Sequence, residues 1–411
     1  MRGGMKKKNW CGGMLALCAA LALGGCTLSN SLRPEAVNSV WGRDAAKQSV
    51  FFATDREPVA GSFGLHWGAA LRCGRTDVTI PAIAMPGQNP GVTAQHCDSA
   101  ATLADFARHI RDAARAMQCN SVLLVIHGYN ATFATGLFRA GQIALDTQWR
   151  CTTLMFSWSS EGKFDRYAAD IERSSYAVPA LIGLMREMKD AGLMVNVVAH
   201  SMGARIVLGA TGALCQERTS VVDQMILSAA DVSAERGNDD FGHLLKRASG
   251  CIRRTTLYSS DNDLALITSE SFHGGVPRAG RIPLHNLQYA TGHGVVDVVD
   301  ASRAPGDPAG HSYFTHAYEM ARDMMWALAG TPAAARATPG GPAGQTLTCL
   351  DWETSSCATG GGRYELAVTR DRQPDRGPRL AQRQLPRRPS LRADIAQAVH
   401  RPTRLTVRCL L

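Results

Sequence analysis

The chain has 411 residues, of which 45% are hydrophobic, so it is long enough for one large α/β domain or two ordinary ones. Its net charge of +9 is concentrated at the two ends: residues 1–26 carry +4 and residues 331–411 carry +7, which leaves −2 for residues 27–330. A nearly neutral body gives no reason to expect nucleic acid or another phosphate-rich partner.

Residues 1–26 have the pattern of a lipoprotein signal peptide. Lys6-Lys7-Lys8 precede an apolar core, residues 14–23, which is too short to span a membrane comfortably. The run Leu23-Gly24-Gly25-Cys26 resembles the bacterial lipobox, in which cleavage leaves the cysteine, here Cys26, as a lipid-modified N-terminus. An ordinary cleavage nearby is the alternative. Thr27 is not the aspartate that marks inner-membrane retention, so we expect an exported protein anchored at the outer membrane and facing the periplasm.

Export makes the nine cysteines after Cys26 candidates for disulfides. None has the C-x-x-C spacing of a zinc site, and we expect neither a metal nor a cofactor. Cys119 and Cys151 each precede a strand-like run by a few residues, and would lie side by side if those strands are parallel neighbours. The other plausible pairs are Cys73 with Cys97, Cys215 with Cys251, and Cys349 with Cys357, which leaves Cys409 unpaired.

The middle of the chain alternates between strands and helices. Residues 27–100 predict an N-terminal extension with the first strands: 49–54 indicate an early strand, whereas the Gly- and Pro-rich stretch 62–95 favours irregular structure with brief strands. In the predicted core, residues 101–330, a helix begins near 101; strand-like runs follow at 122–126, 153–156, 195–199, 225–229, 255–259 and 295–299, and helical ones at 132–147, 167–189, 202–214 and 313–328. This alternation predicts a mostly parallel, doubly wound sheet flanked by helices, with its chemistry beyond the carboxyl ends of the strands.

Residues 331–411 differ in composition from the core. They contain many Ala, Pro, Gly and Arg residues but no lysine, with little periodicity. We therefore expect a disordered C-terminal tail, and a translational artefact is the alternative.

Residues 199–203, Ala-His-Ser-Met-Gly, stand between a predicted strand and a predicted helix. This context is that of a nucleophile elbow, in which a strained turn exposes a serine hydroxyl above the sheet. Ala199 stands where glycine is usual, and the pattern alone also fits a small-residue turn in any α/β domain. The assignment of Ser201 as a nucleophile therefore depends on finding a base, an acid and an oxyanion hole.

The oxyanion hole needs two N–H donors near the serine. His127-Gly128-Tyr129-Asn130 directly follows the strand 122–126, and we expect the N–H groups of Tyr129 and Met202 to be these donors. We expect His127 to order the loop rather than to take part in the chemistry. Trp158 ends another strand, where it would either line the pocket or pack in the core.

The candidate base is His311, which lies between the last predicted strand and the last predicted helix. His293 and His316 are competitors, but the position of His311 lets its imidazole reach over the strand ends. 

Three aspartates are candidates for the acid that orients this imidazole. Asp263 is the first choice, because the turn after the strand 255–259 presents it at the strand tip, and Asp261 is the near alternative. Asp231 follows the strand 225–229, where some lipase-like enzymes place the acid. At least two of the three must be ordinary turn residues or helix N-caps.

These motifs together resemble a bacterial family of uncharacterised α/β-hydrolases in the esterase/lipase superfamily. The matching segments are FFATDR (51–56), HGYN (127–130), FSWSS (156–160), AHSMG (199–203) and GHSYF (310–314). The resemblance spans residues 50–328 and implies the α/β-hydrolase fold and a serine hydrolase mechanism. It supports Ser201 and His311, and Asp263 less directly through residues 262–266; it fixes no substrate.

The leading hypothesis is a lipid-anchored hydrolase of small-molecule carboxylic esters. Ser201 would attack the acyl carbon, His311 would move the proton, and Asp263 would orient the imidazole. An acyltransferase or amidase with the same triad is the nearest alternative, and a non-catalytic envelope lipoprotein with this fold is the alternative from another class. The absence of an obvious apolar lid favours small soluble esters; acyl-chain length and oligomeric state stay open.

Overall fold

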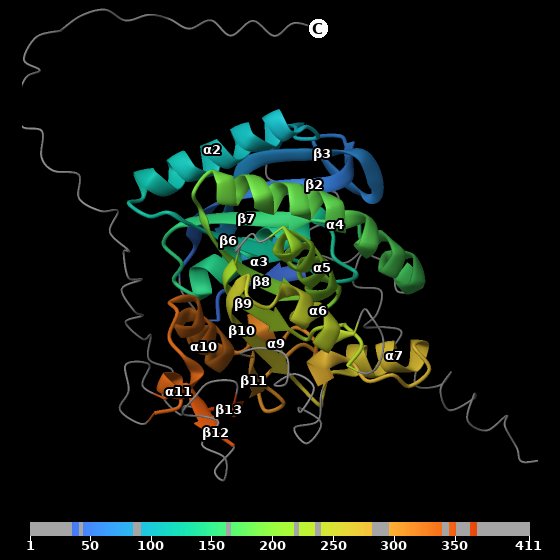
Figure 1. Ribbon diagram of the computed structural model, residues 1–411, viewed down its shortest axis with the longest axis vertical. Coiled ribbons are helices and arrows are strands. Elements are labelled where there is room, and N and C mark those ends of the chain that lie inside the picture. Colours follow the sequence, from blue (N-terminus) through green and yellow to red (C-terminus); the bar gives the residue numbers. More distant parts are fainter. Residues whose placement is uncertain are drawn as a thin grey trace, which may run out of the picture.

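The computed structural model describes residues 35–40, 44–84, 92–161, 166–217, 222–234, 240–281, 296–338, 345–350 and 362–367. Cys26 with the rest of the predicted signal peptide, His293, and residues 368–411 lie outside these ranges. Within them, a sheet of eleven strands runs through the molecule, with helices packed on both of its faces (Figure 1).

The strand order confirms the predicted mostly parallel sheet. From one edge to the other, the strands are β12 (Leu347–Cys349), β13 (Arg363–Leu366), β11 (Val296–Asp300), β10 (Ile252–Ser259), β9 (Val222–Ser228), β8 (Met194–His200), β6 (Ser121–Ile126), β7 (Thr152–Ser157), β2 (Ala46–Val59), β3 (Ser62–Ile80) and β5 (Thr93–His96). Every pairing from β13 to β2 is parallel, and β12, β3 and β5 add antiparallel strands at the two edges. A separate antiparallel pair joins β1 (Glu35–Val37) to β4 (Ala82–Ala84).

The helices form a layer on each face. One layer contains α2 (Ala100–Ala116), α4 (Tyr167–Asp190), α5 (Met202–Gln216) and α6 (Phe241–Ala248), and the other contains α3 (Phe133–Asp146), α9 (Tyr313–His316), α10 (Tyr318–Leu328) and α11 (Ala333–Arg336). In β6, Val122 and Leu124 face the first layer while Leu123 and Val125 face the second. Burial on both faces explains why this strand is an unbroken apolar run. No helix in the described ranges is long and apolar enough to cross a membrane.

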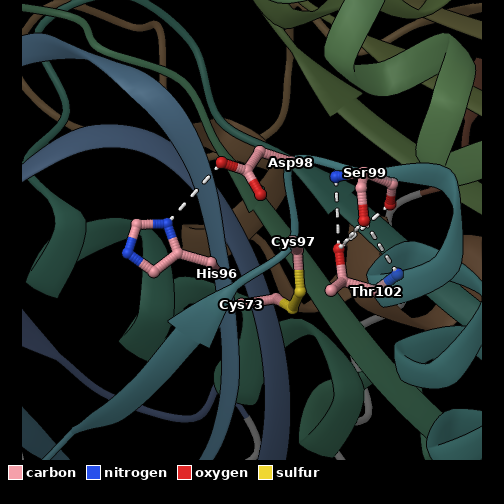
Figure 2. Close-up of a disulfide and its surroundings, with 6 residues drawn as sticks. All are labelled: Cys73, His96, Cys97, Asp98, Ser99 and Thr102. Atoms are coloured by element: carbon pink, nitrogen blue, oxygen red, sulfur yellow. Dashed lines mark hydrogen bonds and ion pairs between the residues drawn. A yellow bond between two sulfur atoms is a disulfide. The ribbon is translucent and has the colours of Figure 1, made fainter. Parts of the chain in front are cut away.

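Three of the predicted disulfides are present. Cys119–Cys151 joins the residues just before the parallel neighbours β6 and β7, and Cys215–Cys251 joins the end of α5 to the start of β10. Cys73–Cys97 lies beside the start of α2, where Ser99 and Thr102 form a reciprocal capping box (Figure 2). Cys349 is also disulfide-bonded. Its predicted partner Cys357 and the predicted unpaired Cys409 lie outside the described residues.

The expectation of irregular structure over residues 62–95 is wrong for most of that stretch. Residues 62–80 form the 19-residue strand β3, which pairs antiparallel with β2 along a long hairpin. The hairpin partner satisfies the backbone groups of β3, and this tertiary pairing outweighs the weak strand propensity of its glycines.

The predicted boundary of the C-terminal tail is also wrong, because residues beyond 331 complete the fold. α11 packs against the core, and β12 and β13 extend the sheet beyond β11. Leu347 and Tyr364 are fully buried. Strands of three or four residues are too short to show a hydrophobic period, so their composition dominated the prediction.

Candidate active site

Ser201 occupies the sharp turn between β8 and α5. Its backbone has φ 53° and ψ −125°, a combination that is rare outside glycine and is strained for a serine. A Cβ added to Gly203 would lie 2.7 Å from the carbonyl oxygen of His127 and 2.8 Å from that of Ile126. The start of α5 therefore packs so closely on the end of β6 that only glycine fits at position 203.

The loop after β6 lies directly against this turn. A Cβ on Gly128 would lie 2.6 Å from the Cβ of Ser201, so the absence of a side chain there permits the approach. Tyr129 is the next residue of this loop, and Met202 begins α5, where the first N–H groups of a helix have no acceptor within the helix. The two expected oxyanion donors thus belong to the two segments that meet at Ser201.

His127 has the contacts of a loop-ordering residue. Its Nδ1–H donates to the Gly128 carbonyl oxygen over 2.8 Å, and its Nε2 accepts from the Ser157 hydroxyl over 3.1 Å. Burial, followed by the nearby Arg56 cation, lowers the pKa of His127 to about 3, so its ring is uncharged. Trp158 stacks on this ring, donates its indole N–H to the His127 carbonyl oxygen over 2.8 Å and is fully buried. Trp158 therefore packs in the core.

Arg56 on β2 holds the loops that follow β6 and β7. Its fully buried guanidinium donates to the carbonyl oxygens of Ala131 (2.7 Å) and Ser160 (3.0 Å) and to the hydroxyl of Ser157 (3.0 Å). Burial lowers the pKa of Arg56 to about 10, while Asp55 opposes that shift, so the side chain stays charged at neutral pH. The FFATDR segment thus contributes a scaffold to the site, a role that sequence reasoning missed.

Asp263 and His311 form the central contact of the site. Asp263 is fully buried and caps the N-terminus of α7 (Leu264–Phe272), where its Oδ1 accepts the Leu266 N–H over 2.9 Å. Its Oδ2 lies 2.7 Å from the Nδ1 of His311. Because Nδ1–H donates to the carboxylate, Nε2 is the nitrogen of His311 left to accept a proton.

The charges around His311 make it a stronger base than an ordinary histidine. Burial lowers its pKa, but the charge and hydrogen bond of Asp263, with smaller effects of Asp307 and Asp231, outweigh burial and raise the pKa. Asp307 also accepts the backbone N–H of His311 over 2.7 Å. The imidazole is therefore fixed in orientation and favoured in its protonated form.

The other two candidate acids have different partners. Asp231 is buried and accepts from the Tyr167 hydroxyl (2.5 Å), the Ser269 hydroxyl (2.6 Å) and the Arg278 guanidinium (2.7 Å). Asp261 is exposed on the turn before α7. In the structure, His311 thus contacts Asp263, whereas Asp231 forms a buried ion pair with Arg278.

His316, the remaining described competitor for the base, is exposed, and its Nδ1 is hydrogen-bonded to the Ser312 carbonyl oxygen over 2.8 Å. That contact is local to α9 and leaves His311 as the histidine paired with a candidate acid.

His200 joins the base to the nucleophile turn. It ends β8 immediately before Ser201, its ring centroid lies 4.5 Å from that of His311, and its Nε2 lies 3.0 Å from the His311 carbonyl oxygen. Among the described residues, the Ser201 hydroxyl makes no hydrogen bond to His311; catalytic hydrogen bonds are often long in unliganded enzymes and shorten with substrate. Sequence reasoning gave His200 no role, because its partners are more than 100 residues away.

A serine in a strained turn and an imidazole held by a carboxylate are two of the parts needed for covalent acyl transfer, and the two expected backbone donors would complete them. In the described ranges no three His, Cys, Asp or Glu side chains form a group that could hold a metal ion. The parallel sheet, its two helix layers and the turn after β8 define an α/β hydrolase.

The chain belongs to a family of α/β hydrolases of unknown function, DUF900, whose model matches residues 99–327. Membership places it among hydrolases of the esterase/lipase type in general. Among solved structures it is distantly similar to a serine-to-alanine mutant of LAE6, an α/β hydrolase enzyme from the metagenome of Lake Arreo, Spain. That similarity has 12% identity and a TM-score of 0.35, and it covers 77% of this chain and 94% of the other. Comparison with curated proteins found no match.

Proposed function

We propose that this protein hydrolyses carboxylic esters through Ser201, His311 and Asp263. The observation that carries the proposal is the 2.7 Å contact between Asp263 and His311. His311 lies in a loop that packs against His200, the residue immediately before Ser201 in the strained turn.

The reaction follows from these positions. The Ser201 hydroxyl attacks the acyl carbon while the Nε2 of His311 takes its proton, and the N–H groups of Tyr129 and Met202 stabilise the negative carbonyl oxygen. His311 then gives the proton to the departing alcohol, which leaves an acyl-enzyme. Water attacks the acyl carbon in the same way, with His311 as base and then as acid, and releases the carboxylic acid and free Ser201.

Exposed apolar residues on α7 support an ester with an apolar group. α7 begins with Leu264, immediately after Asp263, and ends with Phe272, and these two residues are 53% and 60% exposed. An esterase assay on purified protein, with esters of graded acyl-chain length, measures whether the protein prefers longer acyl chains than those of short, soluble esters.

A fluorophosphonate probe tests the nucleophile directly. We expect the folded protein to react with the probe, and Ser201→Ala to lose all labelling. Ser271→Ala removes an exposed serine of α7 and should label like the wild type. Equal labelling of Ser201→Ala, or no labelling of the well-folded wild type, would contradict the proposal.

We further propose that the protein is exported and anchored by lipid on Cys26 at the outer membrane, facing the periplasm. The lipobox-like run before Cys26 supports this, as do three disulfides, which persist in oxidising compartments. Cys26→Ser should lose labelled palmitate and move the protein out of the membrane fraction. Cys18→Ser, in the apolar core of the signal, should change neither result. Retention of lipid by Cys26→Ser would overturn this assignment.

A further inference from the structure

The backbone of residue 311 is held by side chains rather than by secondary structure. His311 lies in the loop between β11 and α9, where no strand or helix pairs its N–H or its carbonyl oxygen. The Asp307 carboxylate accepts the N–H over 2.7 Å, and the His200 imidazole lies 3.0 Å from the carbonyl oxygen. Asp263 fixes the ring at Nδ1. The backbone N–H, the carbonyl oxygen and the ring Nδ1 of His311 thus each have their own side-chain partner.

The His200 ring fills the space between the two loops that border Ser201. It stacks on Phe314 with ring centroids 4.3 Å apart and planes inclined by 22°, and it contacts the His311 ring at 4.5 Å. On its other side, a Cβ on Gly128 would lie 2.9 Å from the His200 Nδ1. The ring therefore lies close to the loop after β6 and packs against the loop that carries His311.

The protonation state of His200 follows from its partner. A carbonyl oxygen only accepts hydrogen bonds, so the Nε2 of His200 carries the hydrogen. Burial, followed by the charge effect of His311, lowers the pKa of His200 well below its ordinary value, and the hydrogen bond to the His311 carbonyl oxygen opposes this shift only in part. The ring stays neutral, and it donates to the His311 backbone without adding a positive charge beside an imidazole that must become protonated.

We propose that His200 is a positioning residue that holds the His311 imidazole over Ser201 through the His311 carbonyl oxygen. For turnover this inference rests on the proposed function, but the hydrogen bond and the ring contacts are properties of the folded chain. Loss of the donor leaves the His311 carbonyl oxygen without its side-chain partner, so that His311 keeps Asp307 at its N–H and Asp263 at its ring, and the imidazole samples orientations away from the serine. A misplacement of about 1 Å in a catalytic group costs up to about 100-fold in rate.

Three substitutions separate the two contributions of the ring. His200→Gln retains an N–H donor at similar reach, His200→Phe retains the ring contacts without a donor, and His200→Ala removes both. We expect kcat to fall about 10- to 100-fold in His200→Phe and His200→Ala, with KM little changed, and to recover most of its value in His200→Gln. Equal kcat in the Gln and Phe variants, or a loss carried by KM, would overturn the proposal.

A spectroscopic measurement tests the same proposal independently of turnover. With histidines labelled with ¹⁵N, the proton shared by His311 Nδ1 and Asp263 gives a low-field NMR resonance whose exchange with water reports how firmly the ring is held. We expect it to persist in the wild type and His200→Gln and to exchange faster in His200→Phe. An identical resonance in all variants refutes the positioning role. If the resonance exchanges faster in His200→Phe, but the wild-type protein neither reacts with the fluorophosphonate probe nor hydrolyses esters, only the proposed function is refuted.

Discussion

Asp231 and Asp263 are both buried carboxylates beyond the carboxyl ends of neighbouring strands, yet their partners differ in kind. Asp231 is paired with the buried Arg278 guanidinium, and arginine side chains are permanent cations in proteins. Asp263 faces His311, whose charge changes during the proposed reaction. A carboxylate beside a permanent cation stabilises structure, whereas one beside a titrating imidazole can stabilise a charge that forms transiently.

The two aspartates should therefore respond differently to the same substitution. Asp263→Asn should lower kcat by about 10⁴-fold, because the amide favours the wrong tautomer of His311 and gives no charge stabilisation. Asp231→Asn should instead lower the free energy of unfolding by about 3–5 kcal/mol, because it leaves Arg278 buried without a counter-charge. Steady-state kinetics and urea denaturation on both variants distinguish the roles. Greater loss of kcat in folded Asp231→Asn would reverse the assignment.

In the proposed reaction, the raised pKa of His311 sets the acid limb of the pH profile. Only the neutral imidazole accepts the Ser201 proton, so activity is lost as pH falls through the pKa of His311. We expect this limb of kcat/KM to have its midpoint above 6.5, the ordinary value. In Asp263→Asn the largest effect that opposes burial of the ring is lost, so the residual activity should show a midpoint at lower pH. A shift to higher pH in that variant would contradict the account.

At the scale of elements, the site depends on which strands are neighbours. β6, β7 and β2 are successive parallel neighbours, so the segments after them lie along one edge of the sheet. The Arg56 guanidinium lies at that edge and donates hydrogen bonds to carbonyl oxygens of the segments after β6 and β7. A single buried cation on β2 thus fixes loops that are about 70 to 100 residues away in the sequence.

Replacement of that cation should destabilise the edge. Arg56→Met leaves several buried carbonyl and hydroxyl acceptors unpaired and removes the charge beside Asp55, so we expect a loss of about 3–5 kcal/mol in the free energy of unfolding. Arg75→Met on the neighbouring strand β3 removes an exposed guanidinium and should cost less than about 1 kcal/mol. Denaturant titration compares them, and equal losses would show that burial of Arg56 is not decisive.

Two properties decided whether a helix or strand could be predicted from the sequence: its length, and the distance along the chain to the element it pairs with. β6, β8, α3 and α5 were predicted nearly to their ends, because each carries enough apolar residues to show its period. α7 has only nine residues and little buried surface, and β13 pairs with a strand some 65 residues earlier, so neither shows in a local window. The sequence ranked Asp263 first but left Asp261 and Asp231 open, because the partners Arg278 and His311 reach two of these carboxylates only in the folded chain.

At the scale of the whole molecule, the fold extends beyond the segment that matches the family. The family match ends at residue 327, whereas α11, β12 and β13 continue the core and the sheet. β13 covers one side of β11, the strand that precedes the His311 loop. β13, in the segment that was expected to be a tail, therefore pairs with the strand that leads into the loop of the candidate base.

Tyr364 offers a test of that extension. Its fully buried side chain lies in the core on β13, so Tyr364→Ala should lower the free energy of unfolding by about 3–5 kcal/mol, as for other large aromatic residues. Glu365→Ala on the same strand removes a partly exposed side chain and should cost less than about 1 kcal/mol. Thermal and urea denaturation give the comparison; unchanged stability in Tyr364→Ala would mean that β13 does not contribute to the core.

Two of the three described disulfides tie the amino edge of the sheet, the edge opposite Ser201. Cys119–Cys151 precedes β6 and β7, and Cys215–Cys251 precedes β10, whereas the candidate catalytic side chains follow strands β8, β10 and β11. Protein made in a reducing cytosol would keep every candidate catalytic group but lack these covalent ties. Such a preparation would start at the same turnover number and then inactivate sooner, so storage life, rather than initial rate, would reveal which compartment the chain was folded in.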